Sequence, residues 1–97
     1  MNTYIMLAHF TEQGIQGVKQ TPERIERGRA SANDLGGEVT DIYLTMGAFD
    51  VVLVTRFPDA EAAAKFALKL GAAGNLRTTT LQAFSEDQYR GIASSMP

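Results

Sequence analysis

One histidine and two arginines are the residues of this chain best suited to chemistry. His9 is the only histidine, and it lies late in the first apolar segment, whereas Arg56 and Arg77 lie at the ends of later β-type segments. A histidine beside arginines can act as a neutral base, or can hold an anionic ligand together with them. The alternative is a partly buried histidine bonded to backbone or water, which we favour because a single histidine is weak evidence for a site.

Asp50 and Tyr43 are further candidate ligand-binding residues, together with Arg56 and Arg77. A buried carboxylate can shuttle protons, but an aspartate at this point more often accepts backbone N–H groups around a turn. A strand tyrosine can offer its phenol to a ligand, although it more often packs with its hydroxyl at the rim. The structural interpretation is preferred for both residues. We expect Asp50 near Tyr4.

Bulk composition excludes several classes of protein. The 97 residues carry a net charge of −2 at a pI of about 5.2, which argues against nucleic-acid binding. With no cysteine and no carboxylate–histidine cluster at ligand spacing, no metal site or cofactor is expected. No apolar run approaches the roughly 20 residues of a membrane span, and no basic leader precedes residue 4, so we predict a cytoplasmic protein.

The first half of the chain predicts a strand and a helix. Residues 4–10 form an apolar β-type run, and residues 14–20 predict an irregular loop or a single helical turn. Thr21 is the predicted N-cap of a helix with Pro22 at its first position, and the glycines at 36–37 are expected to end it.

The middle of the chain predicts a hairpin. Two apolar strands at residues 39–46 and 49–57 surround Gly47 and Ala48, which suit a two-residue type II′ turn because glycine comes first.

The last third predicts a helix, a strand and a short closing helix. Asp59 is the predicted cap of the helix, whose alanine-rich face ends at Gly71 and Gly74, and residues 77–84 form the fourth strand. Ser85 begins a capping box, and an amphipathic stripe follows it at Tyr89, Ile92, Ala93 and Met96.

The resulting order is β-α-β-β-α-β with an extra C-terminal helix, the ferredoxin-like α+β pattern, in a single domain over residues 1–97. In this fold we expect the first strand between the third and the fourth, and parallel to the third. That arrangement predicts that His9, Arg77 and Arg56 gather at one rim of the sheet, beneath residues 11–20.

Two other patterns concern the surface. Residues 5–8 and 51–54 are continuously apolar, so both faces of the central strands are apolar while two helices cover one face. The second face then predicts a homodimer or higher oligomer. Arg24, Arg27 and Arg29 alternate with glutamates, which predicts a solvated helix face.

The chain resembles the GYD domain family. The resemblance rests on residues 43–50, of sequence YLTMGAFD, then on 68–71 and on 75–80, and it covers nearly the whole chain. Gly47 and Asp50 match the motif that gives the family its name, but Phe49 replaces its tyrosine, so any role of that phenol hydroxyl is lost here. The resemblance implies a dimeric α+β barrel in which two ferredoxin-like sheets pack face to face.

Two functions follow as hypotheses. The first is a small homo-oligomeric ligand-binding or assembly module, with a pocket beneath residues 14–20 for a small anionic or aromatic molecule. The second is a cofactor-independent enzyme of monooxygenase or isomerase type, with His9 as base and Arg77 and Arg56 holding an anionic oxygen. An enzyme predicts that His9 points into a closed cavity.

Overall fold

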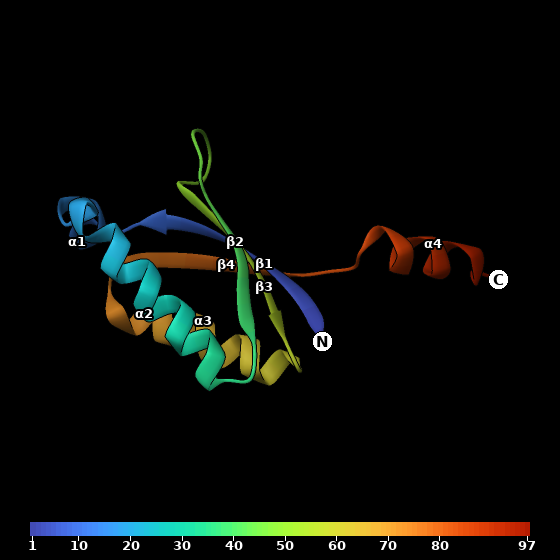
Figure 1. Cartoon of the computed structure of the whole chain (residues 1–97). Helices are drawn as coiled ribbons and strands as arrows, with labels where there is room; N and C mark the ends of the chain where they lie inside the picture. The colour runs from blue at the N-terminus through green and yellow to red at the C-terminus, as the bar shows by residue number, and fades with distance from the viewer.

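The computed structural model describes all 97 residues and confirms the predicted order of elements (Figure 1). Its strands are β1 (Asn2–Phe10), β2 (Glu38–Leu44), β3 (Val51–Phe57) and β4 (Leu76–Ala83). Its helices are α1 (Glu12–Gln16), the 3-10 turn η1 (Val18–Gln20), α2 (Thr21–Asp34), α3 (Ala60–Ala73) and α4 (Glu86–Ser94). The segment expected to be a loop or one turn thus contains η1 and most of α1.

The four strands form one sheet in the order β2-β3-β1-β4, which confirms the ferredoxin-like α+β fold. Every neighbouring pair is antiparallel, so the expectation that β1 runs parallel to β3 is wrong. The physical reason is the hairpin: the β1-α2-β2 crossover keeps β1 and β2 in one direction, and β3 reverses direction and lies between them.

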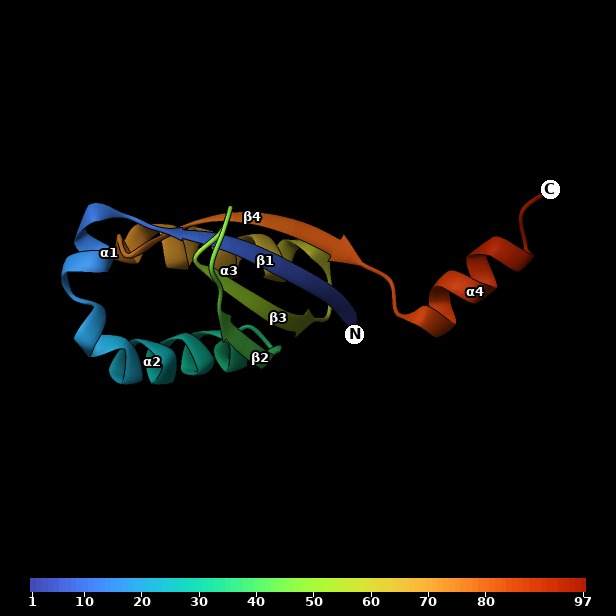
Figure 2. The ribbon, with the colours of Figure 1, turned by 90° about the horizontal axis from the view of Figure 1, so that it is seen from above.

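Helices α2 and α3 lie side by side over one face of the sheet (Figures 1 and 2). Tyr4, Met6 and Ala8 of β1 are buried on that face, whereas the residues between them are only half-buried. The helix-covered face carries the core, which comprises Tyr4, Met6, Ala32, Val39, Leu53, Phe57, Ala62, Ala63 and Phe66. We call the opposite side, which no helix covers, the open sheet face.

Aromatic packing and one buried hydroxyl join the sheet to α3. The rings of Phe57 and Phe66 lie with their centroids 5.2 Å apart, and both side chains are fully buried. Thr55 is also fully buried, and its hydroxyl donates to the backbone oxygen of Tyr4 at 2.7 Å. This bond satisfies the polar group, which would otherwise be costly to bury.

The helix ends follow the sequence signals in most places. The Asp59 carboxylate accepts the N–H of Ala62 at 2.8 Å, and Gly74 ends α3 with a φ of 86°, a left-handed conformation that glycine adopts without strain. Pro22 lies in the first turn of α2 as predicted. Thr21 is not a side-chain cap, because its hydroxyl donates to Val18 in the preceding turn.

The β2–β3 connection is longer than the predicted two-residue turn. β2 ends at Leu44 and β3 begins at Val51, while Thr45 N–H donates to the backbone oxygen of Asp50 at 2.8 Å. The Thr45 hydroxyl also donates to the backbone oxygen of Phe49 at 2.6 Å. These bonds close a wider loop, which rises above the open sheet face (Figure 1).

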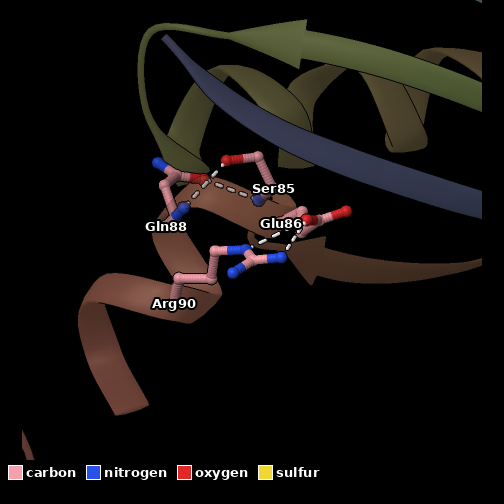
Figure 3. A network of polar contacts seen from close by, with 4 residues as sticks. All are labelled: Ser85, Glu86, Gln88 and Arg90. Atoms are coloured by element: carbon pink, nitrogen blue, oxygen red, sulfur yellow. Dashed lines mark hydrogen bonds and ion pairs between the residues drawn. The ribbon is translucent and has the colours of Figure 1, made fainter. Parts of the chain in front are cut away.

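Helix α4 projects away from the rest of the molecule, beyond the end of the sheet (Figures 1 and 2). Its predicted capping box is present, with Gln88 N–H bonded to the Ser85 hydroxyl and Ser85 N–H bonded to the Gln88 side chain (Figure 3). The chain is elongated as a result, with a radius of gyration of 14.5 Å. A compact chain of this length has a radius of about 12.5 Å. We call residues 84–97 the C-terminal arm.

Candidate functional site

His9 and Arg77 form a cross-strand pair on the open sheet face. The register of β1 and β4 places them directly opposite each other, and both are exposed. The His9 ring lies against the ring of Phe49, with centroids 4.8 Å apart and an interplanar angle of 33°. An imidazole and a guanidinium side by side, with an aromatic ring beside the imidazole, can hold an anionic or aromatic group.

Arg56 lies at the other end of the sheet, so the expectation that it joins His9 and Arg77 is wrong. It pairs with Thr3 of β1 and with Glu38 of β2, and its guanidinium lies 4.0 Å from the Glu38 carboxylate. The cause is the antiparallel direction of β3, which carries its last residues toward the beginning of β1.

The same reversal moves Asp50, which lies beside Ala8 and Phe10 rather than near Tyr4. Its carboxylate accepts the N–H of Phe10 at 2.9 Å, and its own N–H donates to Ala8 at 2.9 Å. Asp50 therefore ties the β2–β3 loop to the end of β1. The carboxylate is used for structure, as the preferred interpretation of the sequence holds.

Tyr43 and the central strands make the open sheet face apolar. Because directly paired residues of an antiparallel sheet share a face, the register assigns these apolar side chains to the open side: Ile5, Leu7, Tyr43, Val52, Val54 and Leu81. Asp41, opposite Val54, and Thr79, opposite Leu7, lie on the same side. Tyr43 and Leu81 are 56% and 45% exposed. The result is a contiguous apolar patch, with His9 and Arg77 at one end and Arg56 at the other.

A second feature, which we call the inter-helix groove, lies between α2, α3 and the sheet. Its volume is about 1390 Å³, and its apolar lining includes Ile25, Ile42, Leu53, Phe66 and Leu70. Gln16, Gly17, Val18 and Gln20 also line it, at the position where the sequence places a pocket. His9 is not among the lining residues of this groove, and its side chain is exposed on the sheet rather than pointing into the groove.

Four cations line the groove, and the sequence interpretation missed them. Arg24, Arg27, Arg29 and Lys69 belong to its lining, which includes no aspartate or glutamate. Arg24 donates to the backbone oxygen of Gly14 at 2.8 Å, and its Nε is buried without a hydrogen-bond partner. Arg24 and Arg29 are therefore half-buried, whereas Arg27 is exposed, as the predicted solvated helix face requires.

The chain offers neither a metal cluster nor a membrane-spanning helix. No group of three or more histidine, cysteine, aspartate or glutamate side chains could hold a metal ion. None of the helices is both long and apolar enough to cross a lipid bilayer.

Comparison with known proteins agrees with this architecture. MtbAldR superimposes with a TM-score of 0.69 at 20% identity over 88% of this chain, which spans only 52% of that protein. TTHA0845 from Thermus thermophilus superimposes with a TM-score of 0.54 at 24% identity, covering 88% of this chain and 95% of that one. At these identities the two structures support the fold alone.

Sequence comparison goes further. A relative from Thermus thermophilus, named glutamine synthetase and cystathionine beta-lyase binding protein, is 34% identical over 84 residues, which are 86% of this chain and 88% of the relative. The family model described as GYD domain matches residues 4–93. The chain therefore belongs to the GYD domain family.

Proposed function

We propose that this protein is a small homo-oligomeric binding module that associates with enzymes of amino-acid metabolism. The observation that carries the proposal is the apolar open sheet face, with Ile5, Leu7, Val52 and Val54 at its centre. Soluble monomers rarely expose a contiguous apolar patch of this kind, whereas self-associating sheets bury it. The name of the 34% identical relative supports protein binding as the purpose of the assembly.

The self-association is tested by a charge at the centre of the open sheet face. Leu7→Glu places a carboxylate among apolar neighbours, so sedimentation velocity at micromolar concentration is expected to show a smaller species than the wild-type oligomer. Leu68→Glu is the matched control, because Leu68 is 73% exposed on α3 and does not belong to the open sheet face. A wild-type chain that sediments as a protomer contradicts the proposal.

The enzyme binding is tested with purified partners. Glutamine synthetase and cystathionine β-lyase, taken from the organism that encodes this chain, are passed separately over three immobilised proteins. These are the wild-type chain, the Leu7→Glu variant and the Leu68→Glu variant. We expect at least one enzyme to be retained by the wild type and by Leu68→Glu with the same affinity. If the wild-type chain is oligomeric but retains neither enzyme, the proposal that it binds these enzymes is contradicted, whereas the proposal that it self-associates is not.

The His9–Arg77 pair supports a ligand site within the same module. Benzoate combines an anionic and an aromatic group, and we expect it to raise the melting temperature of the wild-type chain. Arg77→Gln is expected to abolish the increase and Arg56→Gln to keep it, because Arg56 lies at the opposite end of the sheet. Loss of the increase in both variants, or in neither, excludes a ligand site at His9 and Arg77.

The cytoplasmic location expected from the sequence stays a prediction.

A further inference from the structure

The C-terminal arm presents an apolar helix surface that its own chain leaves uncovered. Tyr89, Ile92 and Met96 are 68%, 45% and 70% exposed, and no residue of α4 is buried. The helix has nine residues, whereas isolated helices shorter than about 12–15 residues are marginal in water. Its capping box and the Arg90–Glu86 ion pair, 2.9 Å apart, favour the helix locally but cover none of the stripe (Figure 3).

The arm cannot reach the inter-helix groove of its own chain. Only Phe84 and Ser85 separate β4 from α4, and two residues span at most about 7 Å. β4 is an edge strand, and α3 packs against it, so α4 would have to pass around α3 to enter the groove. Figure 2 shows α4 directed away from both α2 and α3.

We propose that α4 docks in the inter-helix groove of a second copy of this chain. The two surfaces are compatible in size, because the groove of about 1390 Å³ exceeds the roughly 300–1,000 Å³ of a small-molecule pocket and has room for a nine-residue helix about 14 Å long. They also match in polarity, since the stripe of α4 is apolar and so is the floor of the groove around Leu53, Phe66 and Leu70.

Charge favours the same pairing. The groove is lined by four cations and by no carboxylate, whereas α4 carries Glu86, Asp87 and one arginine. Of the groove cations, Arg24 is already held in place through Gly14, and its buried Nε has no partner. With a net charge of −1, α4 therefore meets a basic groove, which favours docking.

Open space inside the groove supports an occupant rather than a collapsed interface. A side chain added at Gly28, which lines the groove, would meet no atom within 4 Å of its Cβ. Self-association through the arm is independent of the open sheet face, so the inference goes beyond the proposed function and neither depends on the other.

The absence of cysteine from the chain makes the pairing directly testable. Gly28→Cys in the full chain is mixed with a second full chain that carries Ile92→Cys, and a short bismaleimide, which tolerates a small difference in register, joins cysteines that lie close together. We expect a product of twice the chain mass, formed at least about tenfold faster than in a random encounter, because docking raises the local concentration to the millimolar range.

Ser94→Cys is the matched control, since Ser94 lies in the same turn of α4 on the face opposite the stripe. The proposal is overturned if Ser94→Cys joins Gly28→Cys as fast as Ile92→Cys does, or if neither pair forms a product. A chain carrying both Gly28→Cys and Ile92→Cys that joins within itself also overturns it.

Two further experiments identify the molecule that occupies the groove and the interface that holds it. Gly28→Phe fills the groove of every copy, so in that chain alone the backbone amides of α4 are expected to exchange with solvent as rapidly as those of an isolated helix. Ala30→Phe, on the outer side of α2, is expected to leave them protected. If benzoate or a partner enzyme protects the cysteine introduced at position 28 and the arm never joins it, the groove belongs to that molecule and the proposal fails. Persistence of the Gly28–Ile92 product in Leu7→Glu chains separates this inference from the open sheet face.

Discussion

At the scale of single residues, the chemistry-bearing side chains separate into structural and surface groups. The Asp50 carboxylate accepts a hydrogen bond from the backbone N–H of Phe10, and Arg56 forms an ion pair with Glu38. His9 and Arg77 remain together on an exposed face, where they are available to a ligand or to a second chain. Within residues 43–50, Asp50 bonds the backbone of β1 and the Phe49 ring lies against the His9 ring.

The structural role of Asp50 leads to a stability prediction. Asp50→Ala leaves the N–H of Phe10 without an acceptor, so we expect the free energy of unfolding to fall by about 1–3 kcal/mol in urea titrations. Asp50→Asn keeps an acceptor oxygen and should cost less. Asp34→Ala removes an exposed carboxylate from the last turn of α2 and is expected to change stability by less than about 0.5 kcal/mol. Equal effects of Asp50→Ala and Asp34→Ala contradict the assigned role.

At the scale of elements, close contact between the α1 segment and the start of β4 holds one end of the groove. Thr11 N–H donates to the backbone oxygen of Asn75 at 3.1 Å, and the Gln13 side chain donates to Asn75 at 3.0 Å. Gly14 is buried at this contact, and a Cβ there would collide with the backbone oxygen of Asn75. The glycine is required by this approach of two segments far apart in sequence.

Alanine substitutions at two helical glycines, Gly14 and Gly28, are therefore expected to change the free energy of unfolding in opposite directions. Gly14→Ala forces α1 away from Asn75, and we expect a loss of roughly 1–3 kcal/mol in the free energy of unfolding. Gly28→Ala meets no neighbour and improves helix propensity, so it is expected to stabilise the chain by up to about 1 kcal/mol. Chemical denaturation of both variants measures the difference. If the Gly14→Ala chain is as stable as the wild type, Gly14 is not in close contact with Asn75.

At the scale of the whole molecule, the chain exposes more surface than a compact monomer of its size. Its accessible surface is 6469 Å² at 10.5 kDa, and only 12 of 97 residues are buried. A compact monomer of this mass exposes about 5400 Å². The excess lies in the C-terminal arm, the open sheet face and the inter-helix groove, which are the surfaces that the two proposals cover.

A homo-oligomer has a stability that depends on its own concentration. We expect the melting temperature of the wild-type chain to rise as the protein concentration increases from micromolar to hundreds of micromolar, because association stabilises only the folded state. The melting temperature of Leu7→Glu should rise less over the same range, and that of Leu68→Glu should follow the wild type. Differential scanning calorimetry at several concentrations measures this, and a constant wild-type value argues against assembly.

The sequence alone determined the elements and the family, because capping residues, prolines, glycines and apolar periodicity act within a few residues. Asp59, Pro22, Gly74 and Ser85 mark helix ends in the structure as their local chemistry predicts. The apolar runs of β1 and β3 also indicated a sheet with two apolar faces, which the register confirms.

Only the tertiary structure decided which distant residues meet. The direction of β3 separates Arg56 from His9 and brings Asp50 to Phe10, and no local pattern contains that direction. The groove was likewise hidden, because helical spacing puts Arg24 and Arg27 on one side of α2 but only the packing of α2 against the sheet and α3 decides that this side borders a groove. Local signals act over a few residues, whereas sites arise from strand pairing over about 40 to 75 residues of separation, such as Ala8 with Val51 and His9 with Arg77.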